Sequence, residues 1–289
     1  YEIRNSDWSS DVCSSDLPWL GRWMQDNIAL KSARFSLEGW MTIEKGDVAS
    51  GDVWLKKGGA SWQGDNEVHH LSVDNLTAHL SHDKQSWAFY IPDTRIAIDD
   101  KPWPSGALAM AWIPAQDVGG DDRQRSDELR IRASNLALSG LSGLQPFADK
   151  LAPSLGELWR TTQPGGKINL LALDIPLQAT EKTRFQAQWS DLAWKQWKLL
   201  PGAEHFSGSR NGSVEHGELR AQMAKALMPY AGVFRAPLEI AAGEATLSWV
   251  KNDKGFMLDG RDIDVQATGV RARGGFRYLQ PQADDPWLG

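Results

Sequence analysis

Four histidines lie close together in the first third of the chain and are the side chains best suited to bind a metal ion. His69, His70, His79 and His82 fall within fourteen residues, and two residues separate His79 from His82. A zinc site needs three or four ligands in good geometry. Consecutive residues of a strand, such as His69 and His70, point to opposite faces, so they do not easily share one ion. We therefore expect histidines in turns or on a solvated face, and no metal site.

Three aspartates near the C-terminus, Asp259, Asp262 and Asp264, are the second candidate for metal binding. A calcium loop of the EF-hand type alternates its ligands around a central glycine. The three aspartates lack that pattern, and Asp262 and Asp264 fall on the polar side of a predicted strand. We expect solvated carboxylates here, not a calcium site.

The motifs of common catalytic sites are missing from the sequence. Gly140-Leu141-Ser142-Gly143 has the wrong spacing for a nucleophile elbow. Neither a phosphate-cradling loop nor a dinucleotide fingerprint occurs. We expect a protein that is not an enzyme and that needs no cofactor.

The first seventeen residues differ in character from the remainder. Residues 7–17 resemble one reading frame of a sequencing-library adapter, so we assign residues 1–17 to an artefactual tail and exclude them from fold reasoning. Removal of the tail takes away five charged residues and changes the net charge from −6 to −3. They are Glu2, Arg4, Asp7, Asp11 and Asp16. Cys13 also falls in the tail, so no disulfide framework remains. We predict that residues 1–17 are unstructured and that residues 18–289 form one segment without a firm internal boundary.

The composition of residues 18–289 excludes two classes of partner. The mild negative charge and the absence of a basic stripe argue against a nucleic-acid partner. No run of about 18 apolar residues is present, so we expect any membrane anchor to lie outside this sequence.

Alternation of apolar and polar residues predicts strands along most of the chain. Leu129 and Ile131 alternate with Arg130 and Arg132, and similar patterns recur between clusters of Gly, Asn, Asp and Pro. One face of each strand is apolar and the other meets water, as in antiparallel sheets that are solvated on one side. The predicted fold class is all-β, with mainly antiparallel sheets.

Only residues 142–162 favour helix. Their leucines and Phe147 recur at spacings of three and four residues. Ser142 is the predicted N-cap, Pro153 should split the stretch, and Ser154 should cap its second half. The sequence after Thr162 should end it.

Tryptophan is the compositional outlier, with 15 residues in the chain, of which Trp8 belongs to the tail. Indoles could form a sugar-binding platform or line a lipid-facing surface. The favoured interpretation is structural, because a large ring packs well on a half-buried sheet and its N–H needs only one acceptor.

Several strings of residues together resemble one protein family. They are Asp127–Leu136, Leu173–Leu177, Glu181–Phe185, Trp197–Gly202, Phe234–Ile240 and Ala272–Pro281. In combination they resemble the YhdP branch of the AsmA-like lipid-transfer family, over nearly all of residues 18–289.

The resemblance implies an elongated and curved antiparallel sheet whose apolar concave side forms a repeating groove. The same resemblance implies a periplasmic protein that is anchored in the inner membrane by a segment outside this sequence. It also implies that phospholipids move toward the outer membrane with their acyl chains in that groove. Combined with the alternation, it predicts these groove-lining residues: Leu129, Ile131, Phe185, Ala187, Leu247, Trp249, Ile263, Val265, Val270, Ala272 and Phe276.

A second interpretation remains open at this point, a carbohydrate-binding β-sandwich that carries exposed tryptophans. Both interpretations produce alternating strands, so alternation alone does not separate them. A sandwich requires two stacked sheets around a closed core, whereas a lipid groove requires one sheet with an open apolar face.

Overall fold

The computed structural model forms two compact units, each of which is described by itself. The N-terminal unit contains residues 1–125 and 130–160, and the C-terminal unit contains residues 126–129 and 161–289. The described residues are 8–13, 30–44, 46–64, 67–83, 86–115, 127–146, 149, 153–198, 200–233, 235–281, 287 and 288.

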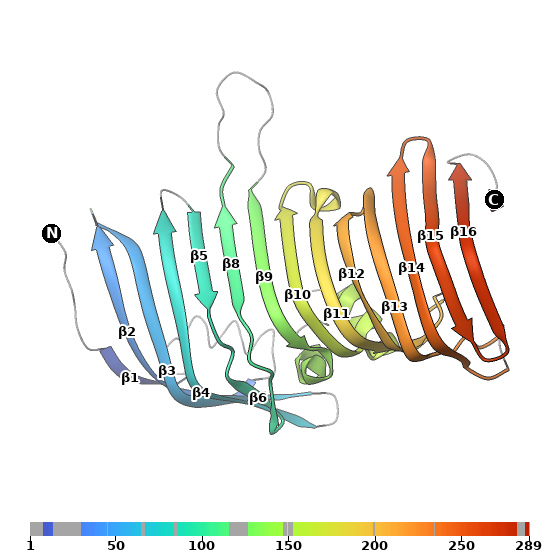
Figure 1. The fold of residues 1–289 in the computed structure, drawn as a ribbon. Coiled ribbons are helices and arrows are strands. Elements are labelled where there is room, and N and C mark those ends of the chain that lie inside the picture. Colours follow the sequence, from blue (N-terminus) through green and yellow to red (C-terminus); the bar gives the residue numbers. More distant parts are fainter. Residues whose placement is uncertain are drawn as a thin grey trace, which may run out of the picture. The chain divides into compact units, whose positions relative to one another are not determined.

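The C-terminal unit is an antiparallel meander in which each strand pairs with the next one in the sequence (Figure 1). Its strands are β10 (Gly165–Pro176), β11 (Arg184–Trp194), β12 (Ala203–Ser213), β13 (His216–Met228), β14 (Leu238–Asn252), β15 (Gly255–Ala267), β16 (Val270–Pro281) and β17 (Trp287–Leu288). These strands belong to one sheet. The described part of this unit therefore lacks the second stacked sheet that a β-sandwich requires.

The N-terminal unit is also built from antiparallel pairs, with one branch point. Its strands are β1 (Trp8–Cys13), β2 (Leu30–Glu44), β3 (Asp47–Gln63), β4 (Val68–Asp83), β5 (Ser86–Ile91), β6 (Ile96–Ile98), β7 (Lys101–Pro102) and β8 (Leu108–Ile113). β4 pairs with both β5 and β6, and β5 continues to β8. β9 (Glu128–Ala137) lies beside β8, where the Ser134 N–H donates to the Ala107 carbonyl at 2.9 Å.

Strand β1 contradicts the prediction that residues 1–17 are unstructured. Trp8–Cys13 pairs antiparallel with β2, with Trp8 opposite Gly39 and Cys13 opposite Arg34. The physical reason is that the edge of a sheet presents a row of unpaired backbone N–H and C=O groups, which accept almost any extended segment. Pairing of this kind depends on the backbone and leaves the origin of these residues as a prediction.

Single-residue bulges interrupt the strands of both units. Six non-glycine strand residues adopt a left-handed conformation with φ between 53° and 59°: Asn75, Asn135, Asp191, His205, Lys225 and Asp262. Asp191 and His205 lie on neighbouring strands, and 2.5 Å separates Asp191 Oδ1 from His205 Nδ1. A bulge bends its strand and shifts the alternation of faces by one residue. On β15, Gly260 before the bulge therefore shares a face with Ile263 after it.

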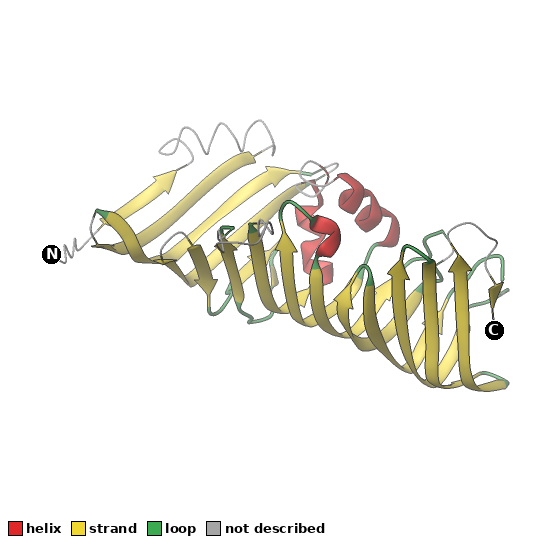
Figure 2. Ribbon diagram, turned by 90° about the horizontal axis from the view of Figure 1, so that it is seen from above, coloured by secondary structure: helices red, strands yellow, loops and turns green. Residues whose placement is uncertain are grey.

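The helices are short, and η1 and α3 overlap residues 142–162, where the sequence predicted helix, although their boundaries differ (Figure 2). A 3-10 helix, η1, spans Leu138–Leu144, and α3 spans Pro153–Thr162. Ser142 is not the predicted cap, because it lies inside η1 and its hydroxyl donates to the Ser139 carbonyl at 2.9 Å. Pro153 begins α3, a position where its missing N–H costs nothing, so Ser154 lies inside the helix and not before it. A further 3-10 turn, η2 (Thr180–Lys182), lies outside the predicted range.

Each unit has a small core on one face of its sheet. In the N-terminal unit Val73, Leu76 and Ala78 are buried against half-buried neighbours such as Leu55. In the C-terminal unit Ile240 is 2% exposed and packs with Ala226 and Ala267. The all-β, antiparallel class with short helices is thus confirmed.

Candidate functional site

Strand register joins residues of the C-terminal unit into four rows on one side of its sheet, which we name the apolar face. The first row is Leu173, Phe185, Gly212, Gly217, Trp249, Leu258 and Tyr278. The second is Leu171, Ala187, Arg210, Leu219, Leu247, Gly260 and Phe276. The third is Ile168, Trp189, Gly208, Ala221 and Ala245. The fourth is Leu192, Phe206, Met223, Gly243, Val265 and Ala272.

Nine of the eleven residues predicted to line a groove share this side of the sheet. Seven belong to the four rows: Phe185, Ala187, Leu247, Trp249, Val265, Ala272 and Phe276. Ile263 and Val270 continue the same side, opposite Gly274 and Ala267 respectively. Val270 is 58% exposed, which places it at the open margin of the face. Their contact with lipid stays a prediction.

The other two predicted residues, Leu129 and Ile131, lie on β9. Both are half-buried, whereas Arg130 and Arg132 between and after them are exposed. The alternation on β9 is therefore the predicted one. β9 spans the boundary between the two units, so a place for these two residues on the apolar face stays a prediction.

The opposite side of the C-terminal sheet carries a network of ion pairs. Glu218 contacts Arg220 at 2.9 Å and Arg261 at 3.4 Å, while Arg277 reaches the Asp259 carboxylate at 3.3 Å. Arg271 and Arg273 both donate to Asp264, at 3.0 and 2.9 Å. Two of the three aspartates considered for calcium thus have arginine partners.

The arginines also fix the charge of Asp264. The hydrogen bond from Arg271, supported by the one from Arg273, outweighs partial desolvation and lowers the pKa of Asp264. This side therefore stays charged and hydrated, in contrast to the apolar face.

The tryptophans on the apolar face donate their indole N–H to a backbone carbonyl or pack against other aromatic rings. Trp249 is 8% exposed, and its indole N–H donates to the Ser213 carbonyl at 3.2 Å. Trp194 donates to the Pro201 carbonyl at 2.9 Å and meets Phe206 edge-on, with ring centroids 5.3 Å apart. Trp189 stacks with Phe206, with ring centroids 5.9 Å apart. These contacts agree with the structural interpretation of the tryptophans.

Arg210 is the functional candidate that the sequence did not reveal. It lies in the second row between Ala187 and Leu219, and no other residue of the four rows carries a charge. Its guanidinium carbon is 4.2 Å from the centroid of the Phe185 ring and 4.6 Å from that of Trp249. Desolvation by these neighbours lowers the pKa of Arg210 from its ordinary value, although not enough to discharge a guanidinium at neutral pH.

The N-terminal unit has an apolar face of its own. Register joins Leu37, Leu55 and Leu76 in one row, and Met41, Gly51, Leu80, Phe89 and Met110 in another. A hollow of about 450 Å³ opens on this face and is lined mainly by apolar residues of β2 and β3, with Leu80 of β4. An open apolar hollow on a single sheet is a feature of ligand-binding surfaces and not of a closed core.

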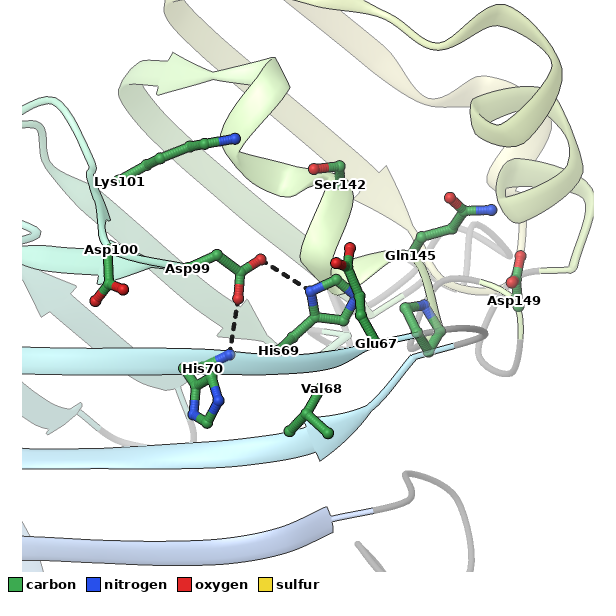
Figure 3. A pocket seen from close by; sticks show the side chains of 11 residues that line it. Glu67, Val68, His69, His70, Asp99, Asp100, Lys101, Ser142, Gln145 and Asp149 are labelled. Carbon is green, nitrogen blue, oxygen red and sulfur yellow. Dashed lines mark hydrogen bonds and ion pairs between the residues drawn. The ribbon is translucent and has the colours of Figure 1, made fainter.

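A polar cavity of about 530 Å³ lies elsewhere in the N-terminal unit, between β4, the β6–β7 hairpin and η1 (Figure 3). Asp99 accepts a hydrogen bond from the His70 backbone N–H at 2.8 Å, and its second oxygen is 2.8 Å from His69 Nδ1. Burial opposes ionisation of Asp99, but these two hydrogen bonds outweigh it and lower the pKa of Asp99 below its ordinary value of 3.8.

We expect the Asp99 contacts to make the N-terminal unit sensitive to acid. A carboxylate whose pKa is lowered by folding contributes stability above its unfolded pKa, and that contribution is lost as the pH falls through the folded value. The loss therefore begins as the pH approaches 3.8 and continues through the lower folded pKa. Asp99→Asn should lower the stability at neutral pH and flatten its decline between about pH 5 and about pH 2, as measured by urea denaturation.

Asp100→Asn is the matched control for this experiment. Asp100 lines the same cavity but makes neither of the two hydrogen bonds described for Asp99. Equal acid sensitivity of the Asp99→Asn variant and the unmodified chain would contradict the stabilising role of Asp99.

The histidines considered for zinc do not converge. His69 and His70 point to opposite faces. The His79 ring lies elsewhere on the sheet, where it contacts the Asp52 carboxylate and stacks with the Tyr90 ring. His82 stacks on Trp87 with ring centroids 4.2 Å apart. Within the described residues, no group of three or more His, Cys, Asp or Glu side chains is placed to hold a metal ion.

Comparison with known proteins identifies the family. The sequence profile of the YhdP protein family matches residues 2–289. The chain belongs to the YhdP family. The intermembrane phospholipid transporter YhdP of Escherichia coli strain K12 is 72% identical over 272 residues, which cover 94% of this chain and 22% of that protein. The chain thus spans about a fifth of the length of this relative.

Two further findings accompany the assignment to the YhdP family. No solved structure matches the chain. None of the helices in the described part of the chain is both long and apolar enough to span a membrane.

The aligned length of 272 residues equals that of residues 18–289, whereas the family profile extends to residue 2. The adapter origin of residues 1–17 therefore stays a prediction, which sequencing of the source gene across this region would decide.

Proposed function

We propose that this chain forms part of a path along which phospholipids cross the periplasm from the inner membrane toward the outer membrane. The acyl chains would lie against the apolar faces of the sheets, and the anchor in the inner membrane would lie outside this chain. The observation that supports the proposal most directly is the register, which gathers nine predicted residues on one side of a single-layer sheet while ion pairs occupy the other. The E. coli relative is named for intermembrane phospholipid transport.

The physical argument concerns the cost of moving a lipid through water. Each methylene group exposed to water costs about 0.8 kcal/mol, so two acyl chains of about 16 carbons present a barrier of roughly 25 kcal/mol. An apolar track removes that barrier only if it is continuous and open. Soluble monomers rarely expose a continuous apolar patch larger than a few hundred Å², so an open apolar face of several rows would need a covering ligand or partner.

Photocrosslinking tests the proposal. A photoreactive residue at Leu247 or Val265 should capture phospholipid, because both side chains lie on the apolar face. The matched positions Ser248 and Gln266 are the next residues of the same strands and face the other side, so they should capture none. The host is the full-length E. coli relative that carries residues 18–289 of this chain in place of its matching segment. Equal labelling of both sides, or no lipid at any position, would refute the proposal.

A further inference from the structure

Arg210 occupies a place where a charge becomes costly once lipid covers the apolar face. Ala187 and Leu219 lie directly opposite it on the neighbouring strands, and the same side of β12 carries only Gly208 and Gly212 next to it. Water hydrates the exposed guanidinium while the face is open, but acyl chains that cover the face would remove this water and leave the charge in need of a partner. The neighbours of Arg210 in the sheet offer aromatic rings but no opposite charge.

The aromatic rings fix the position of the guanidinium group. Phe185 and Trp249 are nearly parallel, with an interplanar angle of 9° and ring centroids 6.5 Å apart. They meet above the paired glycines Gly212 and Gly217, where a Cβ atom built on Gly217 would lie 2.3 Å from Trp249 Cζ2. The glycines therefore make room for the rings, and the rings support the guanidinium through cation–π contacts.

The rings leave the hydrogen-bonding capacity of Arg210 unused. A guanidinium that stacks on aromatic faces still presents its five N–H donors in its own plane. Among the described residues, Arg210 makes no ion pair or hydrogen bond to the protein, whereas Arg220, Arg261 and Arg271 on the other side each have an acidic partner. The Arg210 side chain also remains exposed at the open side of the face.

We infer that Arg210 binds the phosphate group of a phospholipid whose acyl chains lie along the neighbouring apolar rows. This inference rests on the proposed function and adds a position at which the head group is recognised. Phosphate oxygens accept two parallel N–H donors from one guanidinium, so the anion supplies the charge and the acceptors that the protein does not. A lipid that passes along the face would then pause where its phosphate meets Arg210.

Binding of three soluble probes to the full chain tests the inference. They are a short-chain phosphatidylglycerol, the diacylglycerol with the same acyl chains, and glycerol 3-phosphate. The unmodified chain should bind the phospholipid about tenfold or more tightly than the diacylglycerol, because a charge-assisted hydrogen bond is made only to the phosphate. Glycerol 3-phosphate should bind weakly, because it lacks acyl chains. Tight binding of glycerol 3-phosphate would overturn the lipid as the source of the phosphate.

Variants of Arg210 separate this inference from the proposed function. Arg210→Met keeps the length of the side chain and should bind phospholipid and diacylglycerol equally, while retained diacylglycerol binding shows that the face is intact. Arg210→Lys should keep part of the preference, because it keeps the charge but loses the planar donors. Arg220→Met, on the other side of the sheet, should behave like the unmodified chain. A preference for phospholipid that survives in Arg210→Met would refute the inference alone, whereas failure of the unmodified chain to bind either lipid would refute both.

Discussion

Phospholipid passage should stop when a charge is placed on the apolar face, as in Val265→Asp or Leu247→Lys. Val265 lies between Gly243 and Ala272, and Leu247 lies between Leu219 and Gly260, so neither new charge would find an opposite one beside it in its row. An unpaired charge beside acyl chains costs several kcal/mol. Because each 1.4 kcal/mol corresponds to about a factor of ten in rate, transfer should fall by about a hundredfold or more.

The measurement is the rate of phospholipid transfer between the two membranes in cells that depend on the E. coli relative carrying residues 18–289 of this chain. Gln266→Asp is the matched control, because Gln266 follows Val265 directly and lies on the other side beside Arg271. Its transfer rate should stay close to that of the unmodified protein. Full transfer by Val265→Asp, or an equal loss in Gln266→Asp, would show that lipid does not follow the apolar face.

The alternation of residue types was sufficient to predict which residues share a face within each strand. Side chains of a strand alternate strictly, so Leu247 and Trp249, or Val265 and Ile263, had to lie on one side wherever the strand is regular. Hairpin connections then carry the same side from strand to strand. The class of fold and nine residues of the proposed groove followed from this geometry.

The bulges and strand β12 were not predicted, because the positions of both are set by pairing with neighbouring strands. In the sequence, Asp262 fits the polar positions of an alternating strand, whereas in the structure it forms a bulge with φ at 53°. β12 offers no apolar alternation around Arg210, because Gly208 and Gly212 share its side. Only the pairing of Arg210 with Ala187 and Leu219 shows that it faces the apolar rows.

The ends of the helical region show the same limit. The spacing of the leucines predicted a helix up to Thr162, and α3 ends there. Ser142 was predicted to cap a helix from its own local sequence, yet η1 begins at Leu138, where Ala137 precedes it without a side-chain cap. A contact with the sheet instead holds the last turn of η1. The Trp62 indole N–H donates to the Gly143 carbonyl at 2.7 Å and holds η1 against β3.

Removal of Trp62 should therefore cause a large loss of stability in the N-terminal unit. Trp62 is 2% exposed, and its ring lies 5.9 Å from that of His69. Trp62→Ala should lower the free energy of unfolding by about 3–5 kcal/mol, because it leaves a cavity of nearly the whole ring. Trp62→Phe keeps most of the packing but loses the donor to Gly143, so its loss should be about 1–3 kcal/mol.

Chemical denaturation of the full chain measures both losses, and hydrogen exchange locates them. Protection should decrease in β3, β4 and η1 and not in the C-terminal unit, because the described contacts of Trp62 lie within the N-terminal unit. Trp40→Ala is the control: Trp40 is 53% exposed on β2, so its removal should cost about 1 kcal/mol or less. If Trp62→Ala proved no more destabilising than Trp40→Ala, the link between Trp62 and η1 would not support the unit. A larger cost for Trp62→Ala, accompanied by lost protection in η1, would show that this indole holds η1 and with it the wall of the polar cavity that Ser142 and Gln145 line.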